Sequence, residues 1–361
     1  MSFVFIAAGF TQAPVQVPRC VGTILNDLPR TQTQKLRYIQ VLRSAAILIV
    51  LATHCVDPFP LGDAVRSPLM ALLTRHINIV FIFVSGFLFQ YLGSRFVYGS
   101  YLKTKLRNVI VPYVLASLPA IMIYALKLKP LDKFTGIVTA DQPVQMAGLM
   151  LLTGTALAPF WFIPMMAIFY LISPLLIRLD ASRRGYWILV PWLFVAMYVG
   201  RAAGDANPFQ NAVFFGPVYV LGMCVSRYRE TLIPLLERFW PILLITIILP
   251  APIPLGAPLW DPMMLLTKIL VCLGLVGLLA RTADRFPPVV DYLGNISFGI
   301  YFVHYYIVAA ITVLAARGHL PFLHGFPVYL ALLMTVTAVS SLIVMVIKRI
   351  FGKHSRQIIG T

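Results

Sequence analysis

The stretch from Tyr38 to Cys55, YIQVLRSAAILIVLATHC, decides how the rest of the chain is interpreted. About 20 predominantly apolar residues make a helix long enough to cross the hydrocarbon core of a bilayer. This stretch and the two residues after it therefore predict a transmembrane helix at 38–57. Two of its residues, Arg43 and His54, are of kinds that lipid-facing helices rarely carry.

Nine further apolar runs follow along the chain. They lie near 72–92, 109–126, 158–177, 186–203, 209–226, 239–256, 261–280, 292–314 and 326–347. Pro112, Pro164 and Pro250 interrupt three of them, which membrane helices tolerate when neighbouring groups satisfy the freed backbone. The apolar segment 143–157 is shorter and predicts a re-entrant or interfacial helix.

Composition supports a membrane protein, because 60% of the 361 residues are hydrophobic and only 11% are charged. No Pro/Gly/Ser-rich or charged linker divides the chain. We therefore predict an all-α polytopic membrane helix bundle of about ten transmembrane helices over 35–350, with cytoplasmic tails at 1–34 and 351–361. The apolar stretch 2–10 lacks a basic region and is too short to span, so it does not predict a cleaved signal peptide.

The net charge of +17 comes from 29 Lys and Arg that lie in short clusters between the apolar runs. With the N-terminus inside, twenty of them fall in cytoplasmic segments, seven in outer loops and two within spans. Cytoplasmic segments of membrane proteins carry this excess of basic residues. The pattern predicts both termini in the cytoplasm and argues against nucleic acid as a partner. The four cysteines form no CxxC pair, and no metal site is expected.

Arg43 and His54 are 11 residues apart, and a helix turns by about 1100° over that interval, which is roughly 20° beyond three full turns. Both side chains therefore share one face, about 16 Å apart along the axis. Charged residues inside spans normally face the bundle interior, so function is the default hypothesis. The alternative is that Arg43 reaches the inner headgroups and His54 bonds a neighbouring helix.

His54 is suited to take and return a proton near neutral pH, and Asp57 one turn later can orient it or simply mark a helix end. The run YLKTKLRNVIVPY after the second span offers Lys103, Lys105 and Arg107 to phosphate groups. Anchoring at the inner surface accounts for the same basic residues. His304 lies one turn after Tyr301 on an apolar helix, where a lone histidine is more often a packing residue.

Four stretches of the sequence resemble the membrane-bound acyltransferase-3 family, whose members O-acylate polysaccharides, glycans and other small acceptors. They are the Arg43–His54 spacing, FIFVSGFLF at 81–89, KTKLRNVIVPY at 103–113 and LGNISFGIYFVH at 293–304. The resemblance extends from about Leu36 to Ile350.

A weaker likeness is FWFIPMMAIFYLISPLL at 160–176. One departure is that Lys105 and Asn108 stand where the family has a pair of arginines, and Arg107 is the nearest replacement.

The resemblance implies an O-acyltransferase of the bacterial inner membrane that moves an acyl group, acetyl by preference, from cytoplasmic acyl-CoA to an extracytoplasmic carbohydrate such as an exopolysaccharide. Taken together with the residues discussed above, it gives three sets of expected site residues, which are catalytic His54, Arg43 and Asp57; acyl-CoA-binding Arg43, Lys103, Lys105, Arg107, Ser85 and Gly86; and substrate-binding Trp161, Tyr301 and His304. The expected partners are the lipid bilayer, acyl-CoA, the carbohydrate acceptor and polysaccharide biosynthesis proteins.

Two questions stay open from the residues alone. His54 acts either as a general base or as a transient carrier of the acyl group. The rival function is a transporter or flippase of polysaccharide or lipid-linked sugar that performs no chemistry. Such a transporter predicts internal repeats and a longer polar path through the spans.

Overall fold

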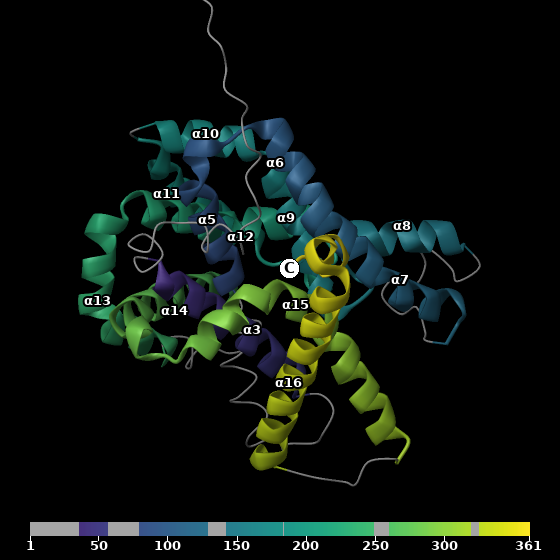
Figure 1. The fold of residues 1–361 in the computed structure, drawn as a ribbon. Helices are drawn as coiled ribbons and strands as arrows, with labels where there is room; N and C mark the ends of the chain where they lie inside the picture. Colours follow the sequence, from purple (N-terminus) through teal and green to yellow (C-terminus); the bar gives the residue numbers. More distant parts are fainter. Residues whose placement is uncertain (1–35, 57–78, 129–141, 183, 249–259, 319–324) are drawn as a thin grey trace, which may run out of the picture.

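The computed structural model describes residues 36–56, 79–128, 142–182, 184–248, 260–318 and 325–361, and no strand occurs among them. This part of the chain is all-α, as predicted, and each of the ten predicted apolar ranges overlaps a helix (Figure 1). The helices are α3 Arg37–His54, α5 Val80–Tyr91, η2 Gly93–Arg95, α6 Tyr98–Lys105, η3 Leu106–Ile110, α7 Val111–Ala125, α8 Pro143–Thr153, η5 Ala158–Trp161, α9 Phe162–Leu171, α10 Ser173–Ala181, η6 Gly185–Ile188, α11 Leu189–Val199, η7 Ala203–Asp205, α12 Pro208–Arg227, α13 Arg229–Ile245, η8 Thr246–Ile248, α14 Trp260–Thr282, η9 Ala283–Arg285, α15 Pro288–Ala316, α16 Phe326–Phe351, η10 Gly352–His354 and α17 Ser355–Ile359.

Six helical segments within the described ranges are long and apolar enough to cross a membrane, so the chain is a multipass membrane protein. They are Tyr98–Ala125, Pro208–Arg227, Arg229–Ile248, Pro262–Arg285, Pro288–Ala316 and Phe326–Ile359. The 18-residue α3 is not among them, because Arg37, Gln40 and Arg43 interrupt its apolar sequence. The count of ten spans and the cytoplasmic placement of both termini stay predictions.

Proline and glycine decide where the apolar runs bend. The predicted span 158–177 is divided into α9 and α10, and Pro174 lies at the start of α10. Proline lacks a backbone N–H and disfavours helical geometry in the residue before it. Gly154 ends α8 in the left-handed region at φ 76°. The chain then bends by 65° into η5 and α9, as a broken span or a re-entrant loop does, and both forms agree with the short segment predicted at 143–157.

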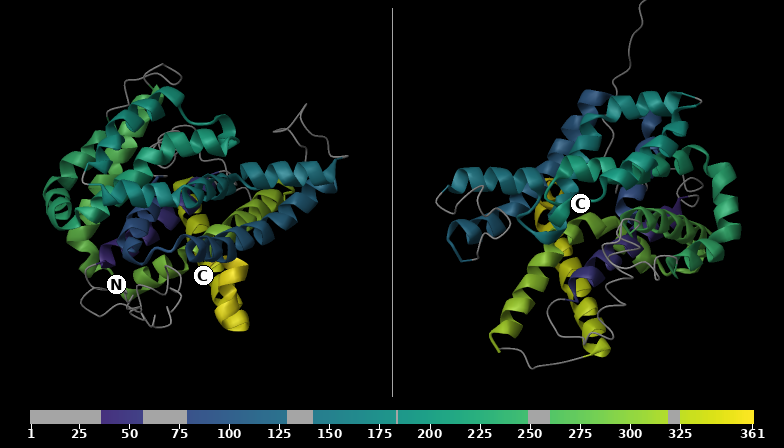
Figure 2. Two further views of the ribbon diagram at one scale, coloured as in Figure 1. Left: turned by 90° about the horizontal axis from the view of Figure 1, so that it is seen from above. Right: turned by 180° about the vertical axis from the view of Figure 1, so that it is seen from behind.

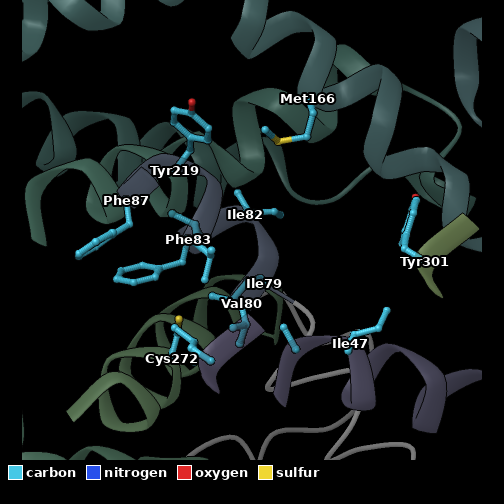
Figure 3. Close-up of a cluster of buried hydrophobic side chains, with 14 of the residues drawn as sticks. Ile47, Ile79, Val80, Ile82, Phe83, Phe87, Met166, Tyr219, Cys272 and Tyr301 are labelled. Atoms are coloured by element: carbon cyan, nitrogen blue, oxygen red, sulfur yellow. The ribbon is translucent and has the colours of Figure 1, made fainter. Parts of the chain in front are cut away.

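The core lies where α3, α5, α12 and α14 meet, and Figure 3 shows Val80 and Phe83 next to Cys272 in this cluster of buried side chains. Helices α5 and α12 pack closely because Gly86 faces the backbone of Tyr219, whose carbonyl a Cβ at this position would overlap. Small residues allow this close approach in membranes, where lipid is as apolar as the helices and packing drives their association.

The outer helices expose apolar side chains to the surroundings. No residue of α13 is buried, and Phe239, Ile242 and Ile245 on it are exposed. Helix α16 and the C-terminal half of α15 extend away from the rest of the bundle when it is seen from the front (Figure 1) and from behind (Figure 2, right). Surfaces of this kind are stable in lipid and unfavourable in water. Helix α3, in contrast, has most of its residues buried, and the site is built around it.

Candidate functional site

The site lies along the contact between α3 and α15, which are joined by polar bonds at several levels. Arg37 forms an ion pair with Asp291 at 2.9 Å, and Gln40 donates to the side chain of Asn295 at 2.8 Å. Residues later in α3 contact residues later in α15, so the two helices run parallel. The predicted order of ten spans also places the first and the ninth in the same direction.

Arg43 points into the bundle and not toward the lipid headgroups, since it is only 7% exposed. Its guanidinium donates to the Gln40 side chain at 3.2 Å and to the Ser297 hydroxyl at 3.3 Å. Ser297 in turn donates to the carbonyl of Gly294 at 2.8 Å. Among the described residues no carboxylate pairs with Arg43. A buried guanidinium with unused donors is suited to hold an anionic ligand.

Gly294 sets the spacing of the two helices at the level of Arg43. A Cβ at this position would lie 2.5 Å from the backbone oxygen of Gln40 and 2.8 Å from the hydroxyl of Ser44. Ser44 also donates to the carbonyl of Val290 at 2.5 Å. Only glycine therefore allows the two backbones to approach this closely while the polar bonds form.

His54 lies in the last turn of α3 and contacts α15 beyond the contact of Arg43, toward the C-terminal ends of both helices. Its ring centroid is 5.5 Å from that of His304 and 5.1 Å from that of Tyr305, which packs edge to face against it. Because Arg43 and His54 both contact α15, they share a face of α3, as their spacing predicts. In a straight helix they are about 16 Å apart along the axis.

His304 is fully buried on α15. Its Nδ1 lies 2.8 Å from the carbonyl oxygen of Tyr301 and 3.1 Å from that of Ile300. Its Nε2 has no hydrogen-bond partner within the part of the chain that the structure describes. The packing interpretation of this histidine is therefore incomplete, because one of its polar atoms is left unsatisfied.

Tyr301 and Trp161 belong to an aromatic group beside the histidines. The Tyr301 hydroxyl donates to the carbonyl of Pro159 at 2.6 Å, and its ring lies 6.2 Å from that of His304. Phe162 lies between the two, with its ring centroid 6.0 Å from that of Tyr301 and 6.4 Å from that of Trp161. This group connects Trp161 to the histidine pair through ring contacts.

The Arg201 guanidinium lies over the ring of Trp161. The Trp161 ring stacks on Phe215 at 5.4 Å, and the guanidinium carbon of Arg201 lies 5.2 Å from the Trp161 centroid. Arg201 makes two 2.7 Å hydrogen bonds to Asp205. Asp205 has φ of 58°, a backbone strain that in proteins often lies close to functional residues. Sequence reasoning missed Arg201 because it lies at the outer end of the predicted span 186–203 and was counted only among the seven outer basic residues.

The basic run lies on α6 and η3, and η3 approaches the Ser297 region of α15 at the end of α17, since a Cβ on Gly360 would lie 2.5 Å from the ring of Phe298 and 3.2 Å from the backbone oxygen of Asn108. Lys103 is exposed on α6, and the Lys105 ammonium lies 5.0 Å from the ring centroid of Tyr170. Arg107 is in η3, a π-helical turn, and its Nε donates at 3.0 Å to the Gln357 side chain in the amide orientation that satisfies both groups. The short helix α17 therefore packs against the predicted phosphate-binding residues.

Three other predicted site residues have different surroundings. Ser85 donates to the carbonyl of Phe81 within its own helix at 2.7 Å, and Gly86 allows close packing on Tyr219. Asp57 lies outside the described residues. Across the described ranges, no three His, Cys, Asp or Glu side chains gather as a metal ion would require.

Sequence reasoning also missed Gln40, Ser297 and Tyr305. The only available signal was spacing, since Gln40 precedes Arg43 by one turn and Ser297 precedes His304 by two turns. A family model described as an acyltransferase domain matches residues 36–345. No curated protein and no solved structure matches the chain. The matched range contains Arg43, His54 and His304.

Proposed function

The chain belongs to the acyltransferase-3 family and is a membrane acyltransferase; on that premise we propose that it O-acylates a carbohydrate hydroxyl outside the membrane with an acyl group from cytoplasmic acyl-CoA. Acetyl-CoA is the proposed donor, and an exopolysaccharide or surface glycan the proposed acceptor. We place the enzyme in a bacterial inner membrane, beside the proteins that build the polysaccharide.

One observation carries the proposal, which is the arrangement of Arg43 and His54 along α15. A buried guanidinium and an imidazole share one face of α3, about 16 Å apart along the axis. In acyl-CoA, the pantetheine arm separates the phosphates from the thioester by a chain of comparable length. Arg43 then holds an anionic part of the donor, while the thioester carbonyl lies beside His54.

The chemistry at His54 is the transfer of one acyl group and one proton. As general base, the imidazole takes the proton of the acceptor hydroxyl while the oxygen attacks the thioester carbonyl. The C–S bond then breaks, and the departing thiolate receives that proton. In the covalent route, the imidazole first attacks the carbonyl and releases CoA, and the hydroxyl then takes the acyl group from the ring.

Carbohydrate as acceptor is supported by the group around Trp161. An aromatic ring next to the Arg201–Asp205 pair offers an apolar face and charged hydrogen-bonding groups, which together suit a hydroxyl-rich ligand. Tyr301 and Phe162 connect this group to the histidines. An acceptor bound near Trp161 would therefore reach His54 from the side of this aromatic group.

The function is tested by mass spectrometry of surface glycans from cells that carry the wild-type gene, no gene, His54→Ala or His354→Ala at equal membrane levels. His354 is an exposed histidine of η10, so its replacement is a matched control. We expect acylated glycans with the wild type and His354→Ala, and a loss of about 100-fold with His54→Ala, the range of general base catalysis. If glycan acylation does not depend on the gene, surface glycan is not the acceptor and the proposed function is wrong.

A further inference from the structure

We propose that His304 is the positioning partner of His54, accepting a hydrogen bond from its imidazole so that the second nitrogen of His54 faces the reacting groups. This inference rests on the acyl-transfer function proposed above and adds a second residue to it. The partner is a neutral histidine on another helix, in the place where many enzymes use a carboxylate.

The hydrogen bonds of His304 fix which of its nitrogens can accept. Backbone carbonyls only accept, so Nδ1, which faces the oxygens of Tyr301 and Ile300, carries the hydrogen. In a neutral ring Nε2 is then the acceptor. This atom is buried without a partner in the described structure, although buried polar atoms usually have one. A donor is therefore missing at Nε2.

His54 is placed to supply that donor. Two imidazoles joined by an N–H···N bond of about 3 Å have ring centroids a little more than about 5 Å apart. The centroids of His54 and His304 are 5.5 Å apart, and the ring planes are inclined by 38°. The bond is not formed in the described structure, where Nε2 of His304 has no partner, and its formation requires the His54 ring to turn until an N–H faces this atom. Tyr305, edge to face against His54 at 5.1 Å, limits how far the ring can turn.

The membrane interior explains why a neutral partner is favoured here. A carboxylate near the centre of a span is costly unless it is paired, whereas a neutral imidazole orients its partner without adding charge. Among the described residues His54 makes no ion pair with a carboxylate. His304 also holds its own orientation through bonds to the backbone of α15, so its Nε2 is fixed in place before substrate arrives.

The bond to His304 has a defined effect on the reaction. It keeps the hydrogen of His54 on the nitrogen that faces α15, and so leaves a lone pair on the other nitrogen. That lone pair takes the proton of the acceptor hydroxyl, and the same nitrogen returns it to the thiolate of CoA. His304 keeps its own proton on Nδ1 throughout, so no proton is lost or gained.

The test compares His304→Leu with His304→Gln in purified protein in lipid nanodiscs, with acetyl-CoA as donor and oligosaccharides from cells lacking the gene as acceptor. Leucine preserves apolar volume and removes the acceptor. The glutamine side chain can accept from His54 and donate to the Tyr301 carbonyl. We expect kcat to fall about 100-fold in His304→Leu and less than about 10-fold in His304→Gln, with the KM for acetyl-CoA unchanged in both.

Two comparisons separate this inference from the function on which it rests. The double variant His54→Ala/His304→Leu should be no slower than His54→Ala, because residues that act as a unit are not additive. Wild-type kcat in folded His304→Leu overturns the positioning role and leaves the acyltransferase in place. Acyl transfer that persists in His54→Ala overturns both.

A measurement on the unmodified protein covers the case in which His304→Leu does not fold. The chain has six histidines, so nitrogen NMR of protein labelled with ¹⁵N-histidine in lipid resolves few rings, and His354→Ala removes one for assignment. We expect one neutral ring protonated on Nδ1 whose Nε2 accepts a hydrogen bond, and a second ring that donates to it. The absence of any N–H···N coupling between two histidines contradicts the proposal.

Discussion

Replacing Gly294 with alanine tests whether the close contact of α3 and α15 holds the site together. The new Cβ would lie 2.5 Å from the backbone oxygen of Gln40, and this atom belongs to a helix and cannot swing away. The helices must separate by several tenths of an ångström or more. Overpacking of this kind typically costs about 1–3 kcal/mol. The bond from Arg43 to Ser297, already 3.3 Å long, would lengthen further.

The assay has two readouts on purified protein, the midpoint of thermal unfolding and the rate of acyl transfer. Gly99→Ala is the matched control, since nothing lies within 4 Å of a Cβ at that position in α6. We expect Gly294→Ala to unfold at a lower temperature and to transfer acyl groups at least about 10-fold more slowly, while Gly99→Ala equals or exceeds the wild type in stability, because alanine favours helix by about 1 kcal/mol. Wild-type stability and rate in Gly294→Ala would refute the argument that this spacing builds the site.

Three further substitutions follow from single contacts. Arg43→Met, compared with Arg349→Met at an exposed position, should raise the KM for acetyl-CoA about 10- to 100-fold, because a charge-assisted bond to the donor is worth roughly 1.5–3 kcal/mol; an unchanged KM removes Arg43 from the donor site. Arg201→Ala should lower the affinity for the glycan acceptor and leave the KM for acetyl-CoA unchanged, and the opposite pattern would place Arg201 with the donor. Gln357→Ala should weaken donor binding by about 3- to 10-fold, since it removes the two hydrogen bonds from the Arg107 guanidinium that orient this cation against α17, and the contact is only structural if donor binding does not change.

The shared face of Arg43 and His54 could be predicted from the sequence because helical periodicity is a local property. The same is true of the apolar segments, although the span 158–177 was expected to be interrupted at Pro164, which lies inside α9, and is divided instead before Pro174. Each of these depends on residues within a few turns of one another.

The partners of that face could not be predicted. His304 is 250 residues from His54, and in lipid every apolar helix side is an equally acceptable surface, so hydrophobic pattern does not choose the neighbour. Close contacts of glycine with backbone, as at Gly86 and Gly294, make that choice, and they appear only in three dimensions. The contact of Gln357 with Arg107 was missed because these two residues are also far apart in the sequence and meet only in the folded chain.

The central claim, that His54 carries acyl transfer, is tested most directly by a single-turnover reaction of purified protein in nanodiscs with [¹⁴C]acetyl-CoA and glycan acceptor. The measured quantity is radiolabel in the glycan as a function of time for the wild type, His54→Ala and His354→Ala. We predict label transfer by the wild type and His354→Ala, and transfer at least about 100-fold slower by His54→Ala with acetyl-CoA still bound. Label that reaches the glycan at the wild-type rate in His54→Ala would contradict the account.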